Sequence, residues 1–154
     1  SRELRIVYCE DESKTGLWLR PAGHEIVISG ARFDRRAVID KLKGWLRSTV
    51  REEIFPLVRQ VAAKNGFDLR DLMVKSQRTR WASCSSKKNL SLNTKLLFLP
   101  PELVRYVITH DLCHTVHMNH SREFWRLVAC HEPAYRTLDA ALREAGKRVP
   151  AWAF

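Results

Sequence analysis

The sequence predicts a single α+β domain over residues 1–154, and three observations support this prediction. The length of 154 residues suits one ordinary domain with its own core better than two. The composition, 45% hydrophobic and 29% charged, is that of a globular chain rather than a disordered one. Short β-prone runs are grouped apart from long stretches with helical spacing, which is typical of α+β folds.

The first 30 residues predict a set of antiparallel strands. β-Branched and other apolar residues are concentrated there in short runs, at residues 4–9, 17–19 and 25–29. Glycine and proline between these runs supply turns. We therefore expect a small antiparallel sheet at residues 1–30.

A long amphipathic helix is predicted over residues 34–65. Asp34 can cap its N-terminus, apolar residues then recur every three or four positions, and Asn65-Gly66 ends the pattern. Pro56 lies inside this stretch and can kink the helix because proline has no N–H group to donate.

A basic strand and hairpin region is predicted over residues 72–98. Strand character is found at residues 72–76, 79–84 and 89–93, with a turn at 85–88. Basic side chains are frequent here and acidic ones are absent between positions 72 and 101; the basic residues are Lys75, Arg78, Arg80, Lys87, Lys88 and Lys95. A solvated hairpin would explain them. So would a surface that contacts substrate or nucleic acid through Arg78, Arg80, Lys87 and Lys88.

The C-terminal part, residues 101–145, predicts helices. Pro100-Pro101 suits the first turn of a helix, and apolar residues continue this helix toward Asn119. Two further helices are expected, one from Ser121 through Val128 and one from Pro133 to about Arg143.

Histidines are concentrated on and just after the first of these helices. Four of the six histidines of the chain fall within residues 110–120. His110 and His114 are about one helical turn apart and project from the same face, so their rings can hold one metal ion between them. A third imidazole must come from His117 or from His120.

His120 is the favoured third ligand, with His117 as the alternate. Three ligands on one straight helix would spread too far along its axis for a tetrahedral site. Asn119 tolerates the left-handed conformation that turns a chain back, which would return His120 to the other two. An imidazole-only site with an open fourth position suits catalytic zinc. His24 and His131 lie outside this group, and we expect them to be structural.

Three blocks of sequence occur together in a characteristic order. They are Arg80-Trp81-Ala82-Ser83-Cys84-Ser85-Ser86, then Asn89-Leu90-Ser91-Leu92-Asn93, then His110-Asp111-Leu112-Cys113-His114 with His120-Ser121 and Phe124-Trp125 after it. Over residues 35–145 the chain resembles the YgjP-like metallopeptidase family and, more distantly, the SprT-like proteases, which act on protein bound to DNA. The resemblance implies a zincin-like fold, in which a His-Glu-x-x-His-type helix packs under a small sheet and His110, His114 and His120 bind zinc.

The sequence departs from this family pattern at two positions. Asp111 stands where the pattern has glutamate, and Ala82 stands where it has glycine. The resemblance implies that residue 111 is the general base. Aspartate is one methylene shorter than glutamate, which withdraws the carboxylate by roughly 1 Å, and a misplacement of that size can lower a rate about a hundredfold.

The leading functional prediction is a zinc-dependent hydrolase of the peptidase type, acting on protein or peptide with Asp111 as base. A second reading is a nucleotide or phosphodiester hydrolase that uses the same metal site, since some members of the family are described as nucleotide pyrophosphatases. A third is a DNA-binding module whose catalysis has lapsed at Asp111. The net charge of +10 favours anionic partners such as nucleic acid or nucleotides in general.

The cysteines and the hydropathy indicate a cytoplasmic protein. Cysteines occur singly, without a Cys-x-x-Cys pair, which predicts reduced thiols rather than disulfides. No stretch is apolar for long enough to span a bilayer, and the sequence shows no signal-peptide pattern. Cys84 could act as a nucleophile beside a histidine, but the sequence contains no feature that would lower the pKa of its thiol.

Overall fold

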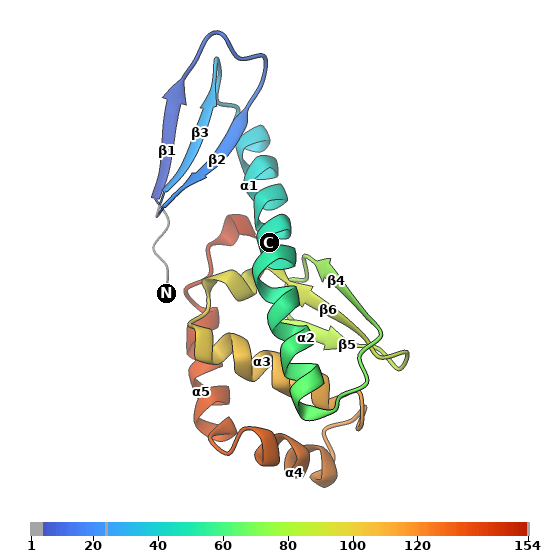
Figure 1. Cartoon of the computed structure of the whole chain (residues 1–154). Coiled ribbons are helices and arrows are strands. Elements are labelled where there is room, and N and C mark those ends of the chain that lie inside the picture. The colour runs from blue at the N-terminus through green and yellow to red at the C-terminus, as the bar shows by residue number, and fades with distance from the viewer. Residues whose placement is uncertain (1–4, 24, 154) are drawn as a thin grey trace. The chain divides into compact units, whose positions relative to one another are not determined.

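The computed structural model describes residues 5–23 and 25–153 (Figure 1). Contacts within the chain group it into two compact units, residues 1–48 and 49–154. A single domain over the whole chain stays a prediction. The predicted α+β class is confirmed, because each unit combines a small sheet with helical residues.

The first unit contains a mixed sheet in the order β1-β3-β2. Its strands are β1 (Arg5–Glu10), β2 (Trp18–Ala22) and β3 (Glu25–Gly30). β3 pairs antiparallel with β2 but parallel with β1, so the prediction of purely antiparallel strands is wrong for β1. β3 is the most buried strand and takes the centre, and two chain reversals then leave β1 running in the same direction as β3. His24 lies outside the described residues.

Residues 35–65 are helical throughout, as predicted, but the helix changes type in the middle. α1 (Arg35–Thr49) is followed by a π-helical turn (Val50–Ile54) and by α2 (Phe55–Asn65). The Asp34 side chain accepts a hydrogen bond from the N–H of Ala37 at 2.8 Å. At the π turn the N–H of Phe55 donates to the carbonyl of Val50, five residues back. This wider turn lets the helix continue past Pro56, which cannot donate a hydrogen bond.

The second unit contains another mixed sheet, in the order β4-β6-β5. Its strands are β4 (Asp71–Lys75), β5 (Ala82–Cys84) and β6 (Asn89–Asn93). β5 pairs antiparallel with β6 and is an edge strand, while β4 pairs parallel with β6. The predicted strand over 79–84 is shorter than expected. Side chains from Asn93 and Lys95 bind the backbone carbonyls just before β5, where a strand neighbour would otherwise bind.

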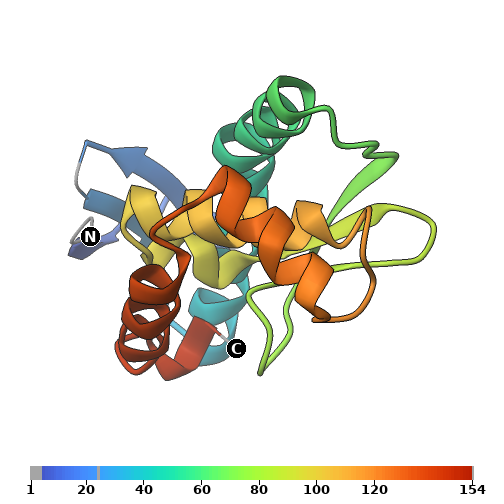
Figure 2. The same ribbon diagram turned by 90° about the horizontal axis from the view of Figure 1, so that it is seen from below.

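α3 lies at the centre of the second unit. The helices of this part are α3 (Pro101–Cys113), α4 (Arg122–His131) and α5 (Tyr135–Gly146), and short 3-10 helices occupy Thr94–Phe98 and Ala151–Ala153. α3 contacts α2, α4, α5 and β5 (Figure 2). The helix is buried on more than one side, since Tyr106 is 1% exposed and Ile108 and Leu112, which project from a different side, are 0% exposed. Within the described residues, every helix is too short or too polar to cross a lipid bilayer.

The end of α3 differs from the expectation. The helix was predicted to continue toward Asn119, but it ends at Cys113. The N–H groups of Thr115 and Val116 donate to the carbonyls of Leu112 and Cys113, three residues back, and thereby tighten the chain into turns. These turns deliver residues 114–120 to the face of α3 that carries His110.

Candidate metal centre

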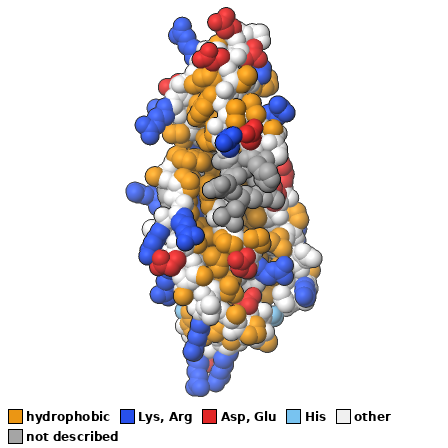
Figure 3. All heavy atoms as spheres, turned by 90° about the vertical axis from the view of Figure 1, so that its left-hand side faces the viewer, with side chains coloured by type: hydrophobic (Ala, Val, Ile, Leu, Met, Phe, Trp, Pro, Cys, Tyr) orange, Lys and Arg blue, Asp and Glu red, His pale blue; other side chains and the backbone are white. Residues whose placement is uncertain are grey.

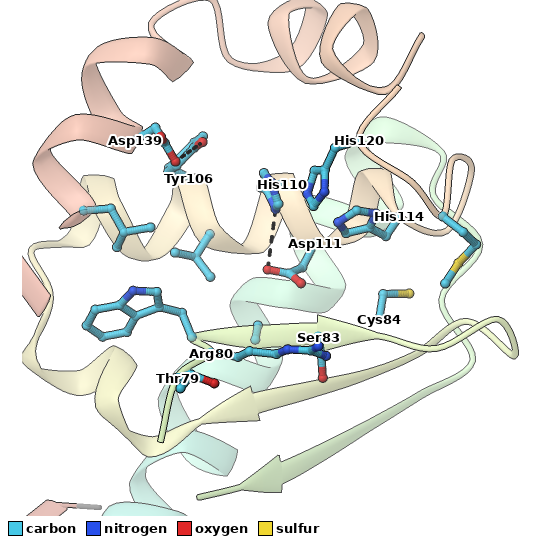
Figure 4. Close-up of a pocket in the computed structure, with 15 residues that line it drawn as sticks. Thr79, Arg80, Ser83, Cys84, Tyr106, His110, Asp111, His114, His120 and Asp139 are labelled. Carbon is cyan, nitrogen blue, oxygen red and sulfur yellow. Dashed lines mark hydrogen bonds and ion pairs between the residues drawn. The ribbon is translucent and has the colours of Figure 1, made fainter. Parts of the chain in front are cut away.

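The structure brings His110, His114 and His120 together in the second unit. His110 projects from α3, His114 follows at its C-terminal end, and His120 comes from the loop before α4 (Figure 4). One ring nitrogen from each histidine lies within 4.8 Å of the others. His114 is buried, His110 is half-buried and His120 is exposed, so the group opens to solvent on one side.

This arrangement fits a zinc ion. Tetrahedral zinc with Zn–N bonds of about 2.0–2.1 Å places its ligand nitrogens about 3.4 Å apart. The separations of up to 4.8 Å therefore need the ligand nitrogens to approach one another by at most about 1.4 Å when the ion binds. A donor set made only of imidazoles suits zinc, and it leaves a fourth position for water or substrate.

His117 takes part through its backbone. The Nδ1 atom of His114 is 2.9 Å from the carbonyl oxygen of His117. Because a carbonyl only accepts, Nδ1 carries the proton and Nε2 of His114 is left with a free lone pair for a metal. Among the described residues, the group of potential ligands contains the ring of His120 and not that of His117.

Asp111 lies on α3 immediately after His110. It is 8% exposed, and its Oδ2 atom is 3.8 Å from Nδ1 of His110. Its carboxylate lines the same pocket as the histidines and faces the strand side of that pocket (Figure 4). The neighbouring charges also act on His120. Partial desolvation lowers the pKa of the His120 ring and the nearby His114 and His110 lower it further, while the Asp111 charge acts in the opposite direction.

The histidines line a pocket of about 510 Å³ between α3 and the segment that leads into β5. One wall is the run of residues from Thr79 to Cys84, and the opposite wall is α3 (Figure 4). At one end, the hydroxyl of Tyr106 donates to Asp139 Oδ1 at 3.4 Å. Arg143 binds the other carboxylate oxygen of Asp139 at 2.7 Å. Burial and the Asp139 charge raise the pKa of Tyr106, so its hydroxyl stays protonated.

The predicted basic residues separate into different environments. Arg80 lines the pocket, whereas Arg78, Lys87 and Lys88 are not among its lining residues. Lys88 forms an ion pair with Asp68, with Nζ 2.7 Å from Oδ2. Figure 3 shows the side of the molecule away from β4, β5 and β6, and on that face Lys and Arg side chains are scattered among apolar and acidic ones.

Asn93 and Lys95 hold the pocket wall, and sequence analysis did not single them out for this role. Asn93 is 1% exposed, and its Nδ2 donates to the carbonyls of Gln77 at 2.5 Å and Arg80 at 2.8 Å. Lys95 Nζ donates to the carbonyl of Arg78 at 2.8 Å. Asn93 falls at a polar position of the alternating run 89–93, where a solvent-facing side chain is the ordinary expectation, so the local sequence carries no signal of this buried role.

Cys84 also lines the pocket, but its environment opposes a nucleophilic role. Burial raises the pKa of its thiol to about 11, and the nearby Asp111 charge contributes to the increase. A thiol in this state is almost entirely protonated near neutral pH.

An α+β fold that presents three imidazoles from a His-x-x-x-His helix and the following loop is that of the zincin-like metalloproteins. The chain belongs to the YgjP-like metallopeptidase family, whose domain matches residues 3–145. Both the predicted family and the predicted zincin-like fold are thereby confirmed.

Solved structures of similar fold include metallopeptidase zymogens from two archaea. Abylysin of Pyrococcus abyssi is 23% identical with a TM-score of 0.52, over 62% of this chain and 94% of that chain. Jannalysin of Methanocaldococcus jannaschii is 21% identical with a TM-score of 0.53, over 60% and 95% of the two chains. Comparison with curated protein sequences finds no match. At these identities the likeness concerns the fold.

Proposed function

We propose that this protein is a zinc-dependent hydrolase that cleaves peptide bonds in protein or peptide substrates. The observation that carries the proposal is the convergence of three imidazole nitrogens within 4.8 Å of one another on the wall of an open pocket. Membership of a metallopeptidase family supports peptide substrates over other hydrolysable bonds.

The histidines and Asp111 have separate roles in this proposal. His110, His114 and His120 hold the ion, and His117 orients His114 through its carbonyl. Bound zinc supplies Lewis-acid chemistry, since it polarises a carbonyl and lowers the pKa of water toward about 7. Asp111 accepts the proton of the attacking water on its carboxylate and delivers it to the leaving amine nitrogen.

The free edge of β5 supports a peptide as substrate. Trp81 accepts a backbone hydrogen bond from Asn93, and Ser85 donates one to Asn89. Antiparallel ladders alternate, so Ala82 and Cys84 direct their backbone N–H and C=O groups away from β6 and toward the open edge. This edge lines the pocket, and an extended peptide could bind there as an added strand.

Arg80 is the substrate-contacting residue that we propose from the basic hairpin. It lies on the pocket wall, and its backbone carbonyl is held by Asn93, so the residue is anchored where it enters the pocket. We expect its guanidinium to bind a carboxylate of the substrate, either an acidic side chain or a chain terminus. Lys88 is a weaker candidate because Asp68 already pairs with it.

The proposal is tested by metal analysis and proteolysis together. We expect the purified protein to take up about one zinc per chain and to degrade an unfolded protein such as reduced casein. His114→Ala should abolish both properties, and Asp111→Asn should slow cleavage by about 100-fold or more while zinc is retained. His131→Ala is the matched control, because His131 packs on Phe67 away from the site. Cleavage that survives in the His114→Ala protein would overturn the proposal.

The nucleotide alternative is decided in the same preparation. Suppose that the protein releases pyrophosphate from nucleoside triphosphates, that Arg80→Ala abolishes this release, and that casein is not cleaved. The metal site would then be assigned to nucleotide hydrolysis instead of peptide cleavage. Salt-sensitive DNA binding without hydrolysis of either substrate would favour the DNA-binding alternative.

A further inference from the structure

The third imidazole of the candidate metal centre is held differently from the other two. His110 projects from the regular helix α3, and His114 is tied by its Nδ1 atom to the carbonyl of His117. His120 lies on a loop and is exposed. Within the described chain, its ring is held by contacts with other rings rather than by a hydrogen bond. Something other than a hydrogen-bonding partner must therefore set its orientation.

Two consecutive aromatic residues of α4 surround the histidines. Phe124 is fully buried, and its ring centroid lies 5.0 Å from that of His110, 4.4 Å from His114 and 4.8 Å from His120. Trp125 stacks on His120, with centroids 5.6 Å apart and planes at 25°. Trp125 also contacts His110, with centroids 5.8 Å apart and planes at 59°. Phe124 thus packs against all three rings, whereas Trp125 offers a nearly parallel face to His120 alone.

Trp125 is itself supported from α5. Tyr135 stacks on the indole, with centroids 5.4 Å apart and planes at 24°. The rings of His120, Trp125 and Tyr135 therefore form a continuous stack that joins the loop, α4 and α5. An indole held in this way cannot turn freely, so it presents a fixed surface to the histidine.

We propose that Trp125 is a positioning residue for the metal site, and that its indole holds the His120 imidazole with a ring nitrogen toward those of His110 and His114. The proposal rests on the zinc site of the proposed function. It assigns to ring stacking the task that a hydrogen bond performs for His114.

The local sequence links this support directly to the ligand. Ser121 follows His120 and caps α4, where its Oγ accepts a hydrogen bond from the N–H of Phe124 at 3.3 Å. The cap sets the direction in which α4 leaves the loop, and Trp125 then lies within the first helical turns, beside the ligand. A single short stretch of chain therefore contains both the loop-borne ligand and its support.

The expected size of the effect follows from side-chain conformations. A histidine on a free surface samples three χ1 wells and about two ring orientations in each, so roughly one conformation in six is competent. The apparent zinc affinity is proportional to the fraction of molecules in which His120 has the competent conformation. Loss of the stack should therefore weaken zinc binding about sixfold. Loss of partners that orient metal-bound histidines commonly weakens binding by about 10- to 100-fold. We expect a loss of about tenfold.

The test compares zinc affinity among substitutions of Trp125, measured by competition with a chromophoric chelator. Trp125→Phe keeps a planar ring, whereas Trp125→Leu keeps apolar contact without one. The proposal predicts near-wild-type affinity for the first, within about threefold, and about tenfold weaker binding for the second. Trp152→Ala is the control, because Trp152 contacts Phe98 instead of the histidines.

A second readout separates ligand positioning from general stability. Co²⁺ in place of zinc reports its coordination through visible absorption, and thermal unfolding of the metal-free proteins reports stability. We expect the Leu variant to show weaker or altered Co²⁺ absorption while its metal-free stability matches that of the Phe variant. Equal zinc affinity and equal Co²⁺ spectra in the Phe and Leu variants would overturn the proposal.

A failure of the role proposed for Trp125 can be distinguished from a failure of the proposed function. A wild-type protein that binds zinc but cleaves no peptide would remove the peptidase assignment and leave the role of Trp125 intact. A wild-type protein that binds no zinc would remove both. Proteolysis with unchanged zinc affinity across the Trp125 variants would remove the positioning role alone.

Discussion

Replacing Asp111 by glutamate should increase peptide cleavage by this protein. Asp111 is 8% exposed, its carboxylate lines the pocket, and its Oδ2 atom lies 3.8 Å from His110 Nδ1. One added methylene extends the carboxylate by roughly 1 Å toward the pocket, and a shift of that size can change a rate about a hundredfold, or about 2.7 kcal/mol in barrier height. The pocket of about 510 Å³ can accept the extra atoms, so we expect little of the overpacking penalty of a closed core.

The measurement is the initial rate of casein cleavage by zinc-loaded proteins at equal metal content. Asp111→Glu should be faster than wild type, and Asp111→Asn, which has the same shape without the charge, should be slower by about 100-fold or more. Thermal unfolding of the three proteins provides the control for folding. A glutamate variant that is folded, fully loaded with zinc and slower than wild type would refute the reasoning about reach. An asparagine variant as fast as wild type would refute the role of the carboxylate.

Three further predictions concern the surroundings of the site. His117→Ala should change zinc affinity by less than about threefold, because its contact with His114 is made by the backbone, whereas His120→Ala should weaken binding by about 100-fold or more in chelator competition. The thiol of Cys84, with a pKa of about 11, is almost entirely protonated at pH 8. Its alkylation at this pH, monitored by mass spectrometry, should therefore be about a hundredfold slower than that of the exposed Cys9. The alkylation rate of Cys84 should rise with pH up to about 11. Phe124→Ala should lower the free energy of unfolding in urea by about 3–5 kcal/mol, because the ring is fully buried, and a loss below about 1 kcal/mol would contradict its placement.

Features set by neighbouring residues could be predicted from the sequence. The helix start at Asp34 and the stop at Gly66 depend on hydrogen bonds within a few residues, and both are found. The cap at Ser121 is of the same kind. The shared face of His110 and His114 follows from helical geometry alone, and the structure brings both into one group.

Features set by distant residues could not be predicted in this way. The parallel pairing of β1 with β3 depends on which strand takes the centre of the sheet, and local strand patterns do not determine that order. The same limit applies to the segment before β5. The strand predicted from residue 79 is not formed before Ala82, and Asn93 and Lys95 bind the carbonyls of this segment from more than ten positions away. The π turn before Pro56 shows a third limit. Because Pro56 has no N–H to donate, the helix can either kink or change its type at this point, and the sequence does not decide between the two.

The choice between His117 and His120 as the third ligand depends on where α3 ends, and the structure places that end earlier than the sequence argument did. The sequence argument placed the chain reversal at Asn119, but α3 already ends at Cys113. Turns at residues 113–117 then bring the carbonyl of His117 to 2.9 Å from Nδ1 of His114. The turns that end the helix therefore also orient His114, and the carbonyl of His117 is the acceptor that they supply for this purpose. Had α3 continued to Asn119, the carbonyl of His117 would have faced along the helix axis and could not have received the Nδ1 proton of His114. The early end of α3 is thus what frees Nε2 of His114 for a metal, and the remaining loop is long enough to return His120 beside it.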